Sequence, residues 1–151
     1  MATFLAFLHH VAAFGLVAAL TAELVLLRGE IAPQMRRLAV FDAAVGICAG
    51  LLVVVGLLRV FYFEKGAAYY FHNAAFIGKM ALFVAMAALS IYPTLKILSW
   101  RKGARADERE LRLVRRLVHT ELVGIVFILL CAAMMARGIG FFGSFPFLSA
   151  G

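Results

Sequence analysis

The stretch "FLHHVAAFGLVAALTAELVLLR", residues 7–28, decides the fold class of this chain of 151 residues. It is almost wholly apolar and long enough for a helix that crosses the hydrocarbon core of a bilayer, which is roughly 30 Å thick and needs about 20 residues. Across the chain 65% of the residues are hydrophobic and 15% are charged, and the mean hydropathy is +0.99. Soluble domains have fewer apolar and more charged residues, so we expect an integral membrane protein.

Three further runs meet the same length requirement, and the sequence therefore predicts an all-α membrane protein built as a four-helix bundle. The predicted spans are residues 4–27, 41–61, 73–98 and 118–137. With their short connections they use nearly the whole chain, so residues 1–151 are expected to form a single membrane domain without a soluble catalytic module. Pro33 is expected to stand in the turn after the first span, and Asp42 to cap or begin the second.

Two connections hold most of the basic residues, namely 28–40 and the segment from Lys96 to Arg116. Under the positive-inside rule both are cytoplasmic, which puts both termini and the connection 59–72 outside. No nucleic-acid motif or aromatic platform stands beside the basic residues, so nucleic acid is not an expected partner. The expected partner of this charge is the bilayer, through its anionic lipid headgroups.

Three ionisable side chains near the outer ends of the spans are candidates for a functional site, because such groups are costly inside a membrane. His9 and His10 lie roughly 8 to 9 Å from the outer end of the first span at 1.5 Å per residue, and Lys79 lies at nearly the same depth in the third. We therefore expect them to face one another across the bundle. Helical phase places Lys79 on one line with Phe83, Met86 and Ser90, and with His72 if the helix extends that far.

An amphiphilic anion with a flat apolar body would suit this arrangement, and haem b is the first candidate. A neutral imidazole of His9 or His10 would be the metal ligand, and a cation such as Arg59 would pair with the propionates. Quinols and other porphyrins are alternatives. A third interpretation assigns no ligand, since long polar side chains also reach the headgroups by themselves. Because adjacent residues point about 100° apart, only one of the two histidines is expected to face a shared ligand.

A second polar layer is expected at the inner ends of the spans. It contains Glu23, Asp42, Tyr92, His119 and Glu121. A second haem held by two histidines would need a pair at this level, and the sequence offers His119 alone. We expect these residues to bind one another, and a proton path through them is a further hypothesis.

Three stretches carry a resemblance to a known family. They are "LHHVAAFGLVAALTAELVLLR" (8–28), "GLLRVFYFEKGAAYYFHN" (56–73) and "GKMALFVAMAALSIYPT" (78–94). Together they resemble a family of small bacterial four-span membrane proteins known only as a domain of unknown function. The likeness covers nearly the full length. It implies the four-span fold and a multi-pass location in the bacterial inner membrane, and it implies no activity.

The chain is also similar, more weakly, to the HemJ-type protoporphyrinogen IX oxidases, which are small haem-binding membrane proteins. That similarity implies a haem b cofactor, an essential histidine at His9 or His10, and an essential catalytic lysine at Lys79. The chain departs from that family in its doubled histidine and in "HTELVGIVF" (119–127) at the entry to the last span, where the family has an Asn-Glu-x-Pro-like pattern.

Two classes of function follow. The first is a haem b-binding redox protein that oxidises a porphyrinogen or exchanges electrons with quinone. The second is a non-catalytic accessory subunit of a larger membrane complex, or a homo-oligomer, that packs through the small residues Gly46 and Gly50, because a small-xxx-small pattern lets two membrane helices approach closely.

Overall fold

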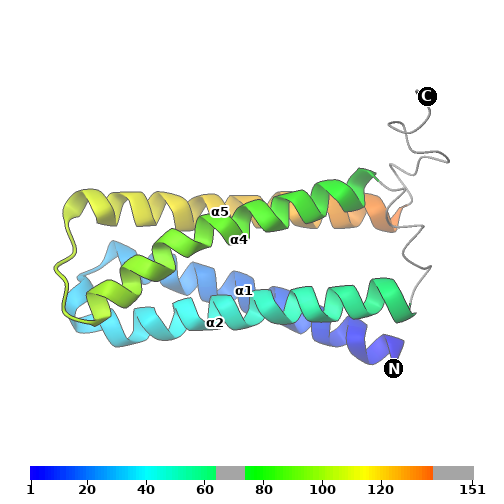
Figure 1. Ribbon diagram of the computed structural model, residues 1–151, viewed down its shortest axis with the longest axis horizontal. Coiled ribbons are helices and arrows are strands. Elements are labelled where there is room, and N and C mark those ends of the chain that lie inside the picture. Colours follow the sequence, from blue (N-terminus) through cyan, green and yellow to red (C-terminus); the bar gives the residue numbers. More distant parts are fainter. Residues whose placement is uncertain (64–73, 138–151) are drawn as a thin grey trace.

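The computed structural model describes residues 1–63 and 74–137, and this part of the chain is helical apart from two connections (Figure 1). The long helices are α1 (Ala2–Arg28), α2 (Ile31–Leu58), α4 (Ala74–Arg101) and α5 (Glu108–Ala136), and a short π-helix, η1 (Arg59–Phe63), continues α2. Each of the four long helices is long and apolar enough to cross a membrane. The predicted four-helix membrane protein is therefore confirmed.

The four helices run alternately in opposite directions along the bundle. Figure 1 shows the α1–α2 and α4–α5 connections at one end, and Met1 at the opposite end, where α5 also finishes. We call the end with the α1–α2 and α4–α5 connections the connection end, and define it by residues 28–37 and 101–107. We call the other the histidine end, defined by His9, Arg59 and Lys79. Which end faces the cytoplasm rests on the positive-inside rule and stays a prediction.

Two expected helix boundaries were wrong, and both concern α2. The chain turns at Gly29 and Glu30, and Pro33 lies inside the first helical turn of α2. Proline is tolerated there because an N–H group in the first turn has no intrahelical partner. Asp42 neither caps nor begins the helix, which starts at Ile31. Hydropathy detects the apolar segment of a helix, and the basic first turns of α2 lie outside that segment.

The closely packed core lies toward the connection end. Leu27, Leu38, Ile97, Val114 and Val118 are each at most 1% exposed, and they come from all four helices. Polar contacts close the same end, as the Arg115 Nε donates a hydrogen bond to the Leu27 carbonyl oxygen at the end of α1. That carbonyl is one of those left without a partner at a helix terminus, so the contact fastens α5 to α1.

The histidine end has fewer buried side chains. Its buried apolar residues are Ala12, Val55, Ala75 and Phe76. Two of these are alanines, and they fill less volume than the leucine, isoleucine and tryptophan side chains of the core. Space therefore remains among the helices on this side of the core.

Candidate functional site

A cavity of about 450 Å³ occupies the space beside the core. Residues of α1, α2, η1, α4 and α5 line it, and most of them are apolar. Its size falls within the range of roughly 300 to 1,000 Å³ that is typical of small-molecule sites. The polar and charged side chains of the lining are His9, His10, Arg59, Lys79, Ser90 and Glu121.

The structure brings four of the predicted site residues to this one cavity. They are His9, His10, Arg59 and Lys79. The fifth, His72, lies outside the described residues. The prediction that the groups on the first and third spans lie at the same level of the bundle agrees with this placement, since α1 and α4 line the cavity together.

His9 sits in the seam between α1 and α2. Its side chain is half-buried, and a β-carbon built on Gly56 would lie 3.6 Å from its Cε1 and 4.0 Å from its Nδ1. These are ordinary van der Waals distances, so the ring packs directly against the backbone of α2. A methyl group would still fit at position 56, whereas a side chain larger than that of alanine would meet the imidazole.

His10 lies on the exposed side of the same turn. Its Nδ1 is 2.6 Å from the carbonyl oxygen of Ala6. A carbonyl oxygen only accepts, so Nδ1 carries the proton, and the Nε2 of the neutral ring keeps its lone pair. Both histidines line the cavity, their ring centroids 6.4 Å apart and their planes at 84°. Which of the two faces a shared ligand stays a prediction, because the cavity borders two adjacent faces of α1.

The helical phase predicted for α4 is confirmed. Lys79, Phe83, Met86 and Ser90 all line the cavity. At 1.5 Å per residue, Lys79 and Ser90 are about 16 Å apart along the helix axis. The cavity therefore has a basic side toward the histidine end and a hydroxyl group at the level of the core.

Glutamate 121 reaches the same cavity from α5, which the sequence analysis did not predict. Glu121 is 4% exposed, and Ser90 donates a hydrogen bond to its carboxylate. Its Oε1 is buried and has no hydrogen-bond partner within residues 1–63 and 74–137. Helical phase puts Glu121 on one face of α5 with Ile125, Ile128 and Ala132, but only the structure shows that this face borders the cavity.

Two further carboxyl groups stand behind the cavity. Glu23 of α1 is 1% exposed and Asp42 of α2 is 7% exposed, and Glu23 is near enough to interact electrostatically with both Asp42 and Glu121. From α4, the Thr94 hydroxyl donates a 2.7 Å hydrogen bond to the Oδ1 of Asp42. We call Glu23, Asp42 and Glu121 the acid layer. Three helices supply its carboxyl groups, and the fourth supplies hydroxyl groups.

The acid layer corresponds only in part to the polar layer expected at the inner ends of the spans. His119 is exposed and does not belong to it. His119 and Glu121 are two positions apart, which places them about 200° apart around α5. Tyr92 is half-buried and packs against the core. No group of three or more histidine, cysteine or acidic side chains could hold a metal ion by itself in the described part of the chain.

Comparisons with known proteins identify the family. No curated protein and no solved structure matches the chain. The similarity to the HemJ-type oxidases therefore stays a prediction. The model of the family described as "Predicted membrane protein (DUF2214)" matches residues 1–140, a range that contains all four long helices and every residue that lines the cavity. The chain thus belongs to the DUF2214 family of predicted membrane proteins.

Proposed function

We propose that this protein is a haem b-binding redox protein of the bacterial inner membrane that acts on a porphyrinogen or a quinone. One observation carries the proposal. A cavity of about 450 Å³ inside a membrane bundle combines apolar walls with two histidines, a lysine and an arginine. Ionisable side chains inside membrane spans mark functional sites by default, because placing them there is costly.

The donor chemistry of the lining fits a haem. A metal-ligating histidine commonly donates its other ring N–H to a backbone carbonyl, which fixes its tautomer and orientation. The contact between His10 and Ala6 supplies this arrangement and leaves Nε2 as the ligand atom. His9, which lines the same cavity, is the second candidate ligand. When bound, the haem would supply one-electron chemistry.

The basic side of the cavity suits the acidic groups of a tetrapyrrole. Arg59 and Lys79 are half-buried, so their charges sit at the border between the apolar walls and the surface. Arginine and lysine pair well with carboxylates, and arginine does so through two parallel hydrogen bonds. In this proposal Arg59 holds the propionates, and Lys79 positions the substrate or exchanges a proton with it.

Glu121 gives the cavity a proton acceptor at the level of the core. A quinol or porphyrinogen releases protons as well as electrons when it is oxidised, and a general base must lie within hydrogen-bond reach of the proton it takes. Glu121 is the acidic side chain among the lining residues, and its Oε1 makes no hydrogen bond to the described residues. In this proposal Glu121 takes the proton and passes it to Glu23 or Asp42.

An absorption spectrum of the purified protein tests the proposal. Protein from haem-replete cells should show a Soret band that shifts on reduction, and the double variant His9→Ala/His10→Ala should lose it. His119→Ala is the matched control, because His119 is exposed and does not line the cavity. A colourless wild-type preparation, or full haem occupancy in the double variant, would contradict the proposal. Glu121→Gln should keep the band and slow turnover of a quinol.

A second candidate function is that of an accessory subunit in a larger membrane complex. Gly46 and Gly50 are exposed on α2, and no atom of another described helix lies within 4 Å of a β-carbon built on either. A helix of another protein could approach this surface closely. Co-purification of a stoichiometric partner without pigment, abolished by Gly46→Leu/Gly50→Leu, would favour this function over the first.

A further inference from the structure

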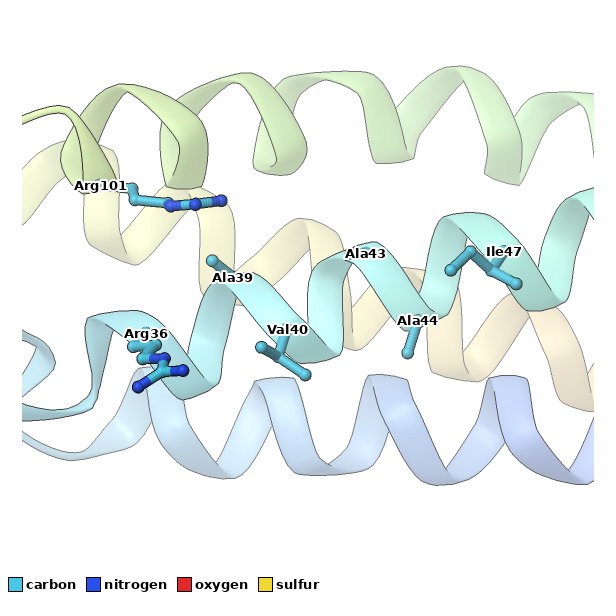
Figure 2. Close-up of a pocket in the computed structure, with 7 residues that line it drawn as sticks. All are labelled: Arg36, Ala39, Val40, Ala43, Ala44, Ile47 and Arg101. Atoms are coloured by element: carbon cyan, nitrogen blue, oxygen red, sulfur yellow. The ribbon is translucent and has the colours of Figure 1, made fainter.

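A second cavity, of about 410 Å³, lies between α2 and the last turn of α4 at the connection end. We call it the arginine groove. Figure 2 shows Arg36 and Arg101 at the end of the groove nearest the connections, and Ile47 at its other end. The remaining lining residues, all from α2, are Ala39, Val40, Ala43 and Ala44. Charge is therefore confined to one end of a groove that is otherwise apolar.

The sequence of α2 produces this groove. Arg36, Val40, Ala43 and Ile47 follow one another at spacings of four, three and four residues, so they share one face of the helix. The alanines leave room between α2 and α4. Val40 is 59% exposed and Ile47 is 64% exposed, so this face meets the surroundings of the bundle rather than its core. In a membrane those surroundings are lipid.

The two arginines are available for an anion. Neighbouring basic residues pair with acids, as Lys96 does with Glu110 and Arg112 does with Glu108. Within the residues that the structure describes, Arg36 and Arg101 form no ion pair and no side-chain hydrogen bond. A guanidinium group matches the geometry of a phosphate and binds it through two hydrogen bonds at once.

We propose that the arginine groove binds an anionic phospholipid. Its phosphate lies between Arg36 and Arg101, and one acyl chain follows Val40, Ala43 and Ile47. The dimensions agree, because the eleven steps from Arg36 to Ile47 span about 16 Å of helix. One leaflet is half of a hydrocarbon core of roughly 30 Å. A soluble phosphate would use the arginines alone and leave the exposed apolar face without a role.

The bound lipid would connect two halves of the bundle. α1 packs mainly against α2, and α4 mainly against α5, whereas α2 and α4 meet over a smaller surface. A phosphate held by Arg36 of α2 and Arg101 of α4 bridges that smaller surface. Basic pockets between membrane helices on the cytoplasmic side are a known form of lipid recognition. This site does not depend on whether the other cavity binds haem.

Native mass spectrometry of the full chain, released from nanodiscs of equal parts phosphatidylglycerol and phosphatidylcholine with identical acyl chains, tests the proposal. Wild-type protein should retain phosphatidylglycerol, and Arg36→Gln/Arg101→Gln should retain roughly thirtyfold less, as expected when two basic residues at an anionic lipid are lost. The matched control is Arg37→Gln/Lys102→Gln, which removes the same charge from adjacent exposed positions outside the groove. Equal losses in both double variants would overturn the proposal.

A third variant separates the acyl chain from the headgroup. Ala43 is exposed in the groove, so Ala43→Phe should fill it without changing the charge or the core, and should reduce retained phosphatidylglycerol as strongly as the arginine pair. Full retention in Ala43→Phe, or complete displacement of the lipid by soluble glycerol phosphate, would show that the arginines bind a headgroup or a free anion only. Either result would overturn the proposed lipid site. Circular dichroism of each variant checks that the helices remain folded.

Discussion

The two ends of this bundle belong to the same four apolar helices but are packed differently. At the connection end, Leu27 and Ile97 are wholly buried and the helices touch through large side chains. At the histidine end, small residues such as Ala13 and Gly56 line a cavity of about 450 Å³. Each of the four long helices is apolar enough to cross a membrane, so the hydropathy of a helix does not predict this difference in packing. What distinguishes the two ends is the volume of the side chains that face the interior.

The polar groups follow the same division. Basic side chains border the cavity toward the histidine end, and the acid layer stands where the cavity meets the core. The acid layer lies within close packing, where hydroxyl groups of α4 donate to two of its carboxyl groups, Thr94 to Asp42 and Ser90 to Glu121. The buried acids therefore stand at the level of the core, while the looser packing toward the histidine end leaves room for a ligand.

Truncating a buried side chain of the core should have the largest effect on the free energy of unfolding. Ile97 is 0% exposed, and Ile97→Ala should lower the free energy of unfolding by about 2–4 kcal/mol, because it removes buried methyl groups and leaves a cavity. Ile91→Ala, on the same helix but 59% exposed, is the control and should change it by less than about 0.5 kcal/mol. Reversible unfolding in detergent measures both. Equal effects would contradict the close packing around Ile97 in the core.

A methyl group added at Gly124, where the core meets the cavity, should have the next largest effect on the free energy of unfolding. A β-carbon at Gly124 would lie 2.2 Å from the Sδ of Met86, so Gly124→Ala must displace that side chain, at a cost of about 1–3 kcal/mol. Adding Met86→Ala should recover most of this loss. Gly46→Ala is the control, since no atom of another described helix lies within 4 Å of its added carbon. A double variant as unstable as the sum of the two single variants would contradict this contact.

Removing a hydroxyl group that donates a hydrogen bond to the acid layer should have a smaller effect on the free energy of unfolding. Thr94→Val keeps the shape of the side chain but leaves the Oδ1 of Asp42 without its donor, which should cost about 1–2 kcal/mol of unfolding free energy. The control is Thr21→Val. Thr21 is exposed and bonds only to the Val17 carbonyl of its own helix. Should the two variants be equally stable, the acid layer would not depend on α4 for its hydrogen bonds.

The smallest effect on the free energy of unfolding is expected for a substitution at Gly56, which lines the cavity. Gly56→Ala places a β-carbon 3.6 Å from the Cε1 of His9, an ordinary contact distance, so the free energy of unfolding should change by no more than about 0.5 kcal/mol. If His9 holds a ligand, the same variant should nevertheless shift the absorption maximum of the bound pigment, because it touches the ring. A large loss of stability would show that this end is as closely packed as the core.

Much of the fold could be predicted because each span carries its own signal. A run of about 20 apolar residues must form a helix in a bilayer, where every backbone polar group needs an internal partner. The helix ends carry weaker signals. The basic residues in the first turns of α2 led to the prediction of a connection there, although the helix begins at Ile31 and contains Pro33. These boundaries depend on local backbone geometry that hydropathy does not report.

The sequence by itself determined the class of this protein, its number of membrane helices and the row on α4 from Lys79 to Ser90, because these follow from local hydropathy and helical periodicity. Only the tertiary structure decided that His9 and His10 border one cavity, that Glu121 reaches it, and that His119 does not. The reason is physical. Periodicity fixes which residues share a face of one helix, but the sizes of side chains on the neighbouring helices decide which faces meet and where space is left between them.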